Sequence, residues 1–181
     1  LDLIGTVDAG KQQLYIAFGS ANKTFQTGTT YNLSTVPTYL AFDDLDLNGT
    51  KDLVVANSTQ AKIWVHLTNP NQSSHLGVNY DLSSNPNYLS IKDVDGDGDL
   101  DLITTNANKT SFSTLLNNGK GVLGSEYKTI NDLTTSPTYV ALQDRDNNSF
   151  LDLISANSDR TKVSVLYGDS DRTLTSAVPL E

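Results

Sequence analysis

The sequence predicts an all-β fold made of β-propeller blades, which are four-stranded antiparallel meanders packed face to face. The first observation behind this prediction is a repeat: segments 43–58, 92–107 and 143–158 align with a period of about 50 residues. The second is that the segments between turns are short and rich in β-branched and aromatic residues, which favours strands over helices. Such repeats bury their faces against their neighbours, so the blades form a propeller or an arc of one.

Four strands fit within one repeat, joined by turns rich in Asn, Gly, Ser and Asp. In the repeat that starts at Pro37, the expected strands are 38–42, 52–56, 62–67 and 78–82. Apolar residues occupy both faces of the inner strands, as expected for a blade that packs against a neighbour on each side.

The 181 residues are expected to form one repeat domain of about three and a half blades. We expect a partial blade at 1–33 and blades at 34–82, 83–133 and 134–181, the last with an incomplete outer strand. An open arc leaves blade faces and strand edges in water. The chain is therefore expected to be an excerpt of a larger propeller, or to self-associate through its terminal blades.

Composition excludes several classes of partner. The net charge is −9 and the isoelectric point is near 4.5, so no basic face is available for nucleic acid or for an anionic membrane surface. No apolar run is long enough for a transmembrane segment. The absence of cysteine excludes disulfides, thiolate metal sites and cysteine nucleophiles.

The acidic residues gather in the turn between the first and second strand of each repeat. In the stretch KDVDGDGDLDLITTN, which starts at Lys92, five aspartates occupy alternate positions ahead of an apolar strand. Two like charges about 4 Å apart repel by about 4 kcal/mol near a protein surface, so a cation is expected inside such a turn. The three turns share the pattern D-x-[DN]-x-[DN]-[GS]-x-x-D, whose alternate side chains converge on the inside of the loop.

These side chains are hard oxygen donors, and six or more such donors at flexible geometry favour Ca²⁺ over Mg²⁺ or a transition metal. We number the loop positions from the first aspartate. The predicted ligands are the side chains at positions one, three, five and nine and the backbone carbonyl at position seven. They are Asp44, Asp46, Asn48, Thr50 and Asp52 in the first loop, Asp93, Asp95, Asp97, Asp99 and Asp101 in the second loop, and Asp144, Asp146, Asn148, Phe150 and Asp152 in the third loop.

Position six requires a sharp bend that a Cβ atom hinders, and its residues are Gly49, Gly98 and Ser149. Ser149, with the neutral Asn147 and Asn148, predicts that the third loop binds most weakly. An EF-hand is excluded, because position twelve lacks the bidentate glutamate and strands flank the loops. The competing interpretation is an Asp- and Asn-rich turn that binds no ion. Recurrence in three repeats favours the metal site.

No catalytic constellation is present in the sequence. The only histidines, His66 and His75, lack matched partners, and there is no G-x-S-x-G, Walker-type or zinc signature, so we expect no enzymatic activity. Trp64 and three recurring tyrosines are expected to pack between blades, with a sugar platform as the alternative. Three asparagines that follow the second strand either form strand-end hydrogen bonds or contact a ligand. These recurring residues are Tyr39, Tyr88, Tyr139, Asn57, Asn106 and Asn157.

The segments DVDGDGDLDLITTNANKTSFSTLLNNGKGVL and DRDNNSFLDLISANSDRTKVSVLYGDSDRTL resemble the FG-GAP/VCBS-type repeats of calcium-binding β-propellers, which are related to the head of the integrin α-chain. The resemblance covers almost the whole chain. It implies Ca²⁺ in the loop between the first two strands of each blade, with the residues given above as ligands, and usually a closed ring of blades.

Two classes of function follow from the loops and the resemblance. The first is a non-enzymatic recognition, adhesion or assembly module, extracellular or at the cell surface, whose Ca²⁺ is structural and whose blade loops bind a protein or glycan. The alternative is an accessory propeller fragment of a larger secreted carbohydrate-active enzyme, such as a polysaccharide lyase or hydrolase, with its chemistry elsewhere.

Overall fold

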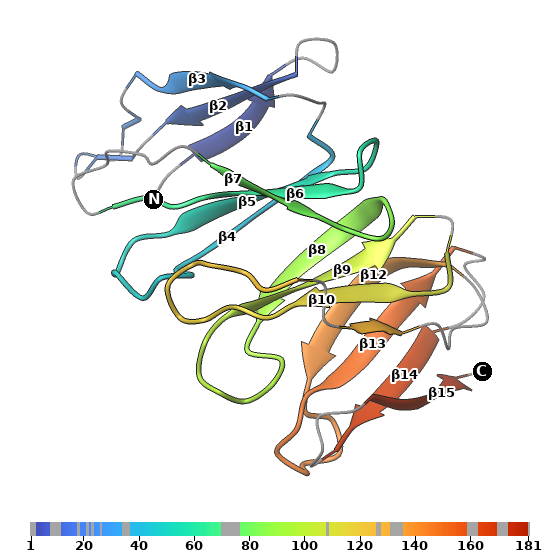
Figure 1. Ribbon diagram of the computed structural model, residues 1–181. Coiled ribbons are helices and arrows are strands. Elements are labelled where there is room, and N and C mark those ends of the chain that lie inside the picture. Colours follow the sequence, from blue (N-terminus) through green and yellow to red (C-terminus); the bar gives the residue numbers. More distant parts are fainter. Residues whose placement is uncertain are drawn as a thin grey trace. The chain divides into compact units, whose positions relative to one another are not determined.

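The all-β fold predicted from the sequence is confirmed by a computed structural model (Figure 1). The structure describes residues 3–7, 12–17, 19–20, 22, 24–25, 27–33, 37–69, 77–107, 109–125, 128–130, 136–158, 163–169 and 174–180. Within these ranges all regular structure is β-strand, and no helix has the length and hydropathy needed to cross a membrane. The chain divides into two compact units, Leu1–Thr38 and Tyr39–Glu181.

The first unit contains one antiparallel sheet of three strands, β1 (Leu3–Val7), β2 (Gln13–Ala17) and β3 (Thr29–Asn32). Leu14 and Ile16 are buried and alternate with the half-buried Gln13 and Tyr15 along β2, which is the pattern of a half-buried strand.

The second unit contains three four-stranded antiparallel sheets, each made of consecutive strands. They are β4 (Tyr39–Asp43), β5 (Asp52–Asn57), β6 (Lys62–His66) and β7 (Val78–Asp81); β8 (Pro86–Lys92), β9 (Asp101–Asn106), β10 (Phe112–Leu115) and β11 (Lys128–Ile130); and β12 (Pro137–Gln143), β13 (Asp152–Asn157), β14 (Val163–Gly168) and β15 (Leu174–Leu180). Each sheet is the meander predicted for a blade, and the strands of the first repeat begin and end within one residue of the expected positions.

The expectation of an incomplete outer strand in the last repeat is wrong. β15 pairs with β14 from the Gly168–Leu174 pair to the Val163–Leu180 pair, so it runs along the whole of its partner. The seven residues Leu174–Leu180 are enough, because the partner strand has six. The boundaries expected at residues 34, 83 and 134 stay predictions, and His75 lies outside the described residues.

Two apolar clusters join the three sheets of the second unit. In the first, Ile63 and Val65 of β6 pack with Leu89 of β8 and Leu102 of β9. In the second, Phe112 of β10 packs with residues of β12, β13 and β14. Sheets that bury apolar residues on both faces are the face-to-face packing expected of blades.

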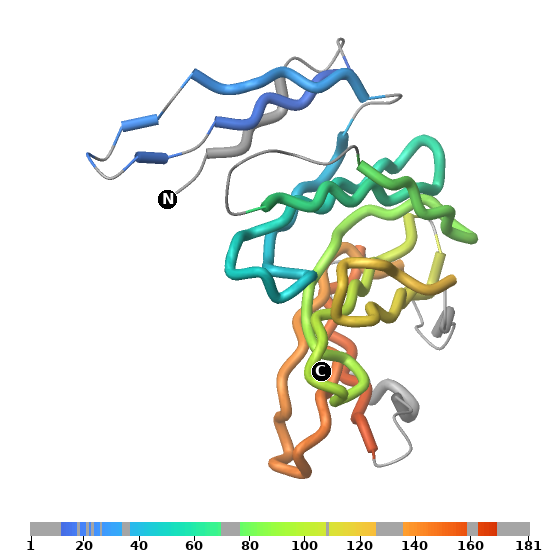
Figure 2. The backbone as a smooth tube through the Cα atoms, turned by 60° about the vertical axis from the view of Figure 1, so that its left-hand side comes forward, coloured from blue at the N-terminus to red at the C-terminus, as the bar shows by residue number. Residues whose placement is uncertain are grey.

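The recurring tyrosines lie in one row across these sheets. The ring centroids of Tyr39 and Tyr88 are 4.5 Å apart, and those of Tyr88 and Tyr139 are 4.4 Å apart. Tilted rings at this spacing form favourable aromatic pairs, so the tyrosines pack between blades as the first interpretation of the sequence expects. Figure 2 shows a bent loop between the first two strands of each sheet in the second unit, and these loops are the acidic segments.

Candidate metal sites

Each acidic loop brings three carboxylates together at the end of its sheet. In every loop the aspartates at positions one, three and nine offer oxygen atoms that lie within 4.8 Å of one another. The groups are Asp44, Asp46 and Asp52 in the first loop, Asp93, Asp95 and Asp101 in the second loop, and Asp144, Asp146 and Asp152 in the third loop. Such a group can hold a metal ion, whose positive charge offsets the repulsion among the three carboxylates.

The aspartate at position nine anchors the loop to its sheet. Asp52 has no exposed surface, and its two oxygens accept the Leu45 N–H and the Thr68 N–H, both at 2.8 Å. The second and third loops repeat this arrangement. Their distances are 2.8 and 2.9 Å at Asp101, and 2.8 and 3.0 Å at Asp152. A buried carboxylate must be hydrogen-bonded, and here each one ties position two to the end of the third strand.

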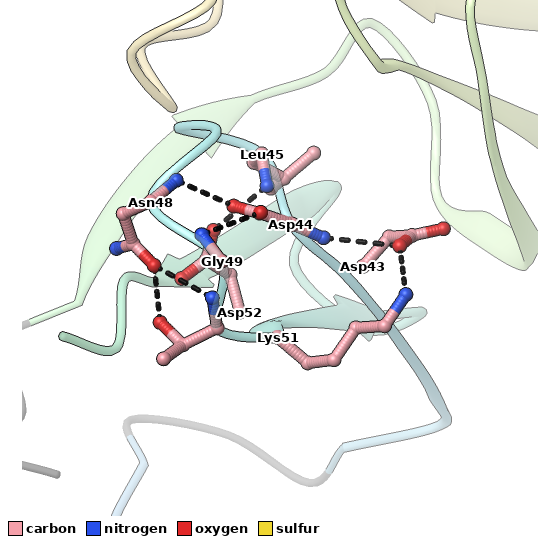
Figure 3. A network of polar contacts seen from close by, with 8 residues as sticks. Asp43, Asp44, Leu45, Asn48, Gly49, Lys51 and Asp52 are labelled. Carbon is pink, nitrogen blue, oxygen red and sulfur yellow. Dashed lines mark hydrogen bonds and ion pairs between the residues drawn. The ribbon is translucent and has the colours of Figure 1, made fainter. Parts of the chain in front are cut away.

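The aspartate at position one folds the loop around itself. Asp44 accepts the Asn48 N–H at 3.0 Å and the Gly49 N–H at 2.8 Å (Figure 3). Asn48 in turn accepts the Thr50 N–H at 2.8 Å, and its amide group donates to the Thr68 carbonyl at 2.8 Å. Short polar side chains that bond to nearby N–H groups form such turns locally, which explains the spacing of the acidic and amide residues.

The loop backbone takes left-handed conformations at positions four and six. At position six, φ is +87° for Gly49, +96° for Gly98 and +73° for Ser149, which confirms the sharp bend inferred from the sequence. The sequence analysis missed position four, where φ is +58° for Leu47 and +60° for Asn147. A side chain with a Cβ is disfavoured in this region, although asparagine tolerates it.

Burial and charge make the carboxylates at position nine of the first and second loops costly to ionise. Burial raises the pKa of Asp52 to about 6, two backbone hydrogen bonds oppose the rise, and the neighbouring Asp46 and Asp44 add to it. The pKa of Asp101 is likewise raised to about 6, chiefly by burial. A cation among these carboxylates would favour their ionised form.

The structure brings together part of each predicted ligand set. Asp97, the acidic residue at position five of the second loop, is not in the carboxylate group of that loop. Instead it accepts the Asp99 N–H at 2.9 Å, as Asn148 accepts the Phe150 N–H at 2.8 Å in the third loop. The predicted roles of all five positions as metal ligands stay predictions.

Sequence reasoning missed the residues that close each site from the third strand. Thr68, Asn117 and Gly168 each follow position nine by sixteen residues and donate their N–H to its carboxylate. The contact is made by the backbone, so it does not require a particular side chain at these three positions. The constant spacing of sixteen residues was the only signal of their role in the sequence.

The recurring asparagines after the second strand have structural roles. Asn106 is fully buried and donates to Ser111 and Ser113 at 3.0 Å, and Asn157 donates to Ser164 at 2.9 Å. His66 is buried and stacks on Trp64 with ring centroids 5.0 Å apart.

Antiparallel meanders packed face to face, each with an acidic loop between its first two strands, define a propeller-type repeat protein. Residues 93–155 match the model of the FG-GAP-like repeat, and the chain carries FG-GAP-like repeat sequence. The resemblance noted in the sequence is thereby confirmed for this repeat family. No curated protein matches the chain by sequence.

Solved structures share the fold at low sequence identity. An Agrocybe aegerita lectin that recognises non-reducing terminal N-acetylglucosamine aligns over 98% of this chain with a TM-score of 0.67 and 18% identity. BBS1N in complex with ARL6DN, from crystals soaked with lead or mercury, aligns over 98% of this chain with TM-scores of 0.56 and 0.57 and 14% identity. The chain spans 48% of the lectin chain and 56% to 57% of the BBS1N chains.

Proposed function

We propose that this chain is a calcium-binding part of a β-propeller that serves non-enzymatic recognition or adhesion outside the cell. The observation that carries the proposal is the carboxylate triad that recurs in three loops, each anchored by a buried aspartate. One acidic turn has little meaning alone, but three turns with the same hydrogen-bond framework are explained by a shared ion.

The donor set fits Ca²⁺ better than other common metals. Each loop offers carboxylate oxygens at positions one, three and nine, a carboxylate or amide oxygen at position five and a carbonyl at position seven. Hard oxygen donors in a flexible loop suit Ca²⁺, whereas Mg²⁺ requires a nearly ideal octahedron and transition metals prefer nitrogen or sulfur. The bound ion would supply positive charge that lets the acidic turn remain compact, which is a structural role.

A calcium titration tests the proposal directly. We expect calorimetric titration of chelator-treated protein to show binding that Asp46→Asn, Asp95→Asn and Asp146→Asn reduce, each at its own loop. Asp81→Asn is the control, because Asp81 is an exposed strand residue that pairs with Lys62. Absence of calcium binding by the parent protein at millimolar ion would reject the proposal.

The recognition part of the proposal rests on the fold and the repeat family. FG-GAP repeats are typical of extracellular proteins, and a lectin is among the structures with a similar fold. Loops at the ends of propeller sheets are positioned by a rigid scaffold, which suits them to bind a glycan or a protein. Binding to arrayed glycans and cell-surface proteins, with and without calcium, tests this part, and a lack of any calcium-dependent ligand counts against it.

We infer further that the third sheet of the second unit binds another propeller sheet, supplied by a second copy of the chain. In the first sheet, Ala56 and Ile63 lie opposite each other in the register and are buried in the cluster shared with the second sheet. At the equivalent place in the third sheet, Ala156 is exposed, Val163 is 37% exposed and Tyr139 is 49% exposed. An apolar face that continues an established packing pattern favours association.

Light scattering tests this association. We expect the parent protein to form a dimer or larger assembly, and Val163→Arg to weaken it. Val122→Arg is the control, because Val122 is 52% exposed in a turn outside that face. A monomer that persists at high concentration with calcium present would exclude the second copy as the occupant.

A further inference from the structure

The turn at 117–123, which follows β10, contacts the second acidic loop. The Asn117 N–H donates to the buried Asp101 carboxylate at 2.9 Å. Gly119 lies so close to the loop that a Cβ atom added there would come within 2.6 Å of the Asp99 carboxylate. The turn therefore packs closely against the second acidic loop at Asn117 and Gly119.

The same turn contacts the first acidic loop. The Gly121 N–H donates to the Leu45 carbonyl, at position two of that loop, at 3.1 Å. A Cβ atom added at Gly121 would come within 2.5 Å of Leu67, the residue before Thr68. Thr68 is the residue that closes the first site from the third strand.

The side chain of Asn117 connects the two loops. It is 5% exposed, and its amide group donates to the Leu45 carbonyl at 2.7 Å and to the Leu100 carbonyl at 3.0 Å. The Leu45 peptide is thus held at both ends, because its N–H donates to Asp52 at 2.8 Å. A buried amide with both donors used by different loops fixes the position of one loop relative to the other.

The third loop cannot be joined to the second loop in this way. Gly168 takes the place of Asn117, since its N–H donates to Asp152 at 3.0 Å, but glycine has no side-chain amide. Among the described residues, the side-chain link therefore joins the first and second loops only.

We infer that Asn117 is a positioning residue that couples the first and second metal sites, so that an ion in one loop strengthens binding in the other. The inference rests on the proposed calcium function. An ion that fixes Asp101 also fixes the backbone of Asn117, whose side chain then holds Leu45 and, through it, Asp52. Coupling of this kind is reciprocal, and one buried hydrogen bond corresponds to about a twofold to tenfold change in affinity.

The test follows calcium binding at the second loop by the amide NMR signal of Gly98. Asp46→Ala, which disables the first loop, is expected to weaken binding at the second loop by about twofold to tenfold. Asp146→Ala, which disables the third loop, is expected to leave it unchanged. In the Asn117→Ala background the effect of Asp46→Ala should disappear.

Asn106→Ala is the matched control, because Asn106 is a fully buried amide of the same sheet that bonds to Ser111 and Ser113 rather than to a loop. The effect of Asp46→Ala should persist in that background. Coupling that is absent from the parent, or that survives Asn117→Ala, overturns the inference.

A second readout needs no metal. Hydrogen exchange of the Leu45 N–H in chelator should be faster in Asn117→Ala than in Asn106→Ala, because only the first variant removes a hydrogen bond to the Leu45 carbonyl. If the parent binds no calcium, the proposed function fails, and exchange alone decides the positioning role. Equal exchange in the two variants then overturns that role, and faster exchange in Asn117→Ala supports it.

Discussion

The second and third loops share the hydrogen bonds that anchor position nine and that join position six to position one, and they differ in the residues between these points. In the second loop both left-handed positions are glycines, with φ of +76° at Gly96 and +96° at Gly98. In the third loop they are Asn147 and Ser149, with φ of +60° and +73°. Glycine adopts this conformation without cost and serine does not, so the third loop stores strain that the second lacks.

The second and third loops also differ in charge. The second loop carries five aspartates, whereas the third carries three together with Arg145. The Arg145 guanidinium donates to the Tyr167 hydroxyl at 2.9 Å, so a cationic side chain is fixed beside the third loop. The comparison shows that hydrogen bonds from loop N–H groups to the shared aspartates set the shape of the loop, while the other residues set its charge and strain. We expect the second loop to bind calcium more tightly.

The largest expected effect comes from removing an anchor that all three loops share. Asp101→Ala leaves two N–H donors without their carboxylate, those of Val94 and Asn117. Unsatisfied buried donors cost about 1–3 kcal/mol each, so the free energy of unfolding should fall by about 2–6 kcal/mol. Chemical denaturation in chelator measures this change. Asp97→Ala, at an exposed position of the same loop, should change stability by less than 1 kcal/mol or so; equal losses would refute the anchoring role.

Calcium should distinguish the second loop from the third. An ion that binds only the folded chain adds about 2.7 kcal/mol of stability at one hundred times its dissociation constant, so the unfolding temperature should rise with the logarithm of free calcium. Mg²⁺ should substitute poorly. Removing the aspartate at position three should reduce this rise more in Asp95→Ala than in Asp146→Ala. Thermal melts across a calcium series give the answer, and an equal loss in the two variants would contradict the ranking.

The pH dependence of the metal-free protein should reflect Asp52 and Asp101. Burial raises the pKa of each to about 6 from 3.8, so the folded state binds these protons more tightly than the unfolded state. Their contribution to stability is therefore complete below about pH 4 and is lost as pH rises through 6. Denaturation in chelator between pH 4 and 7 should show this decline, and Asp101→Asn should reduce its slope while Asp81→Asn does not.

Saturating calcium should reverse this trend, because the ion competes with protons for the same carboxylates. Stability that falls with pH to the same extent with and without calcium would show that the ion does not bind at position nine.

The sequence predicts the parts of this molecule that depend on side-chain pattern. The repeat period, the strands of the first repeat and the bend at position six all follow from residue types, because glycine and β-branched residues have strong backbone preferences. The sequence did not reveal what depends on backbone contacts between distant segments. Thr68, Asn117 and Gly168 differ in side chain and share a role through their N–H groups, and the bond from Asn117 to Leu45 spans 72 residues.

The smallest expected effect comes from exchanging the residues at position six. Gly98→Ser should destabilise the second loop by about 1–2 kcal/mol through φ alone, because a Cβ atom at Gly98 would meet no atom within 4 Å. Ser149→Gly should relieve strain in the third loop, although the greater freedom of glycine in the unfolded chain offsets part of the gain, which leaves about 0.5–1 kcal/mol. Stability in chelator and calcium affinity should therefore fall in the first variant and rise in the second. A fall in affinity in Gly98→Ser together with a rise in Ser149→Gly would support strain as the cause of the difference in calcium affinity between the loops. Affinities that are unchanged in both variants would leave charge as that cause.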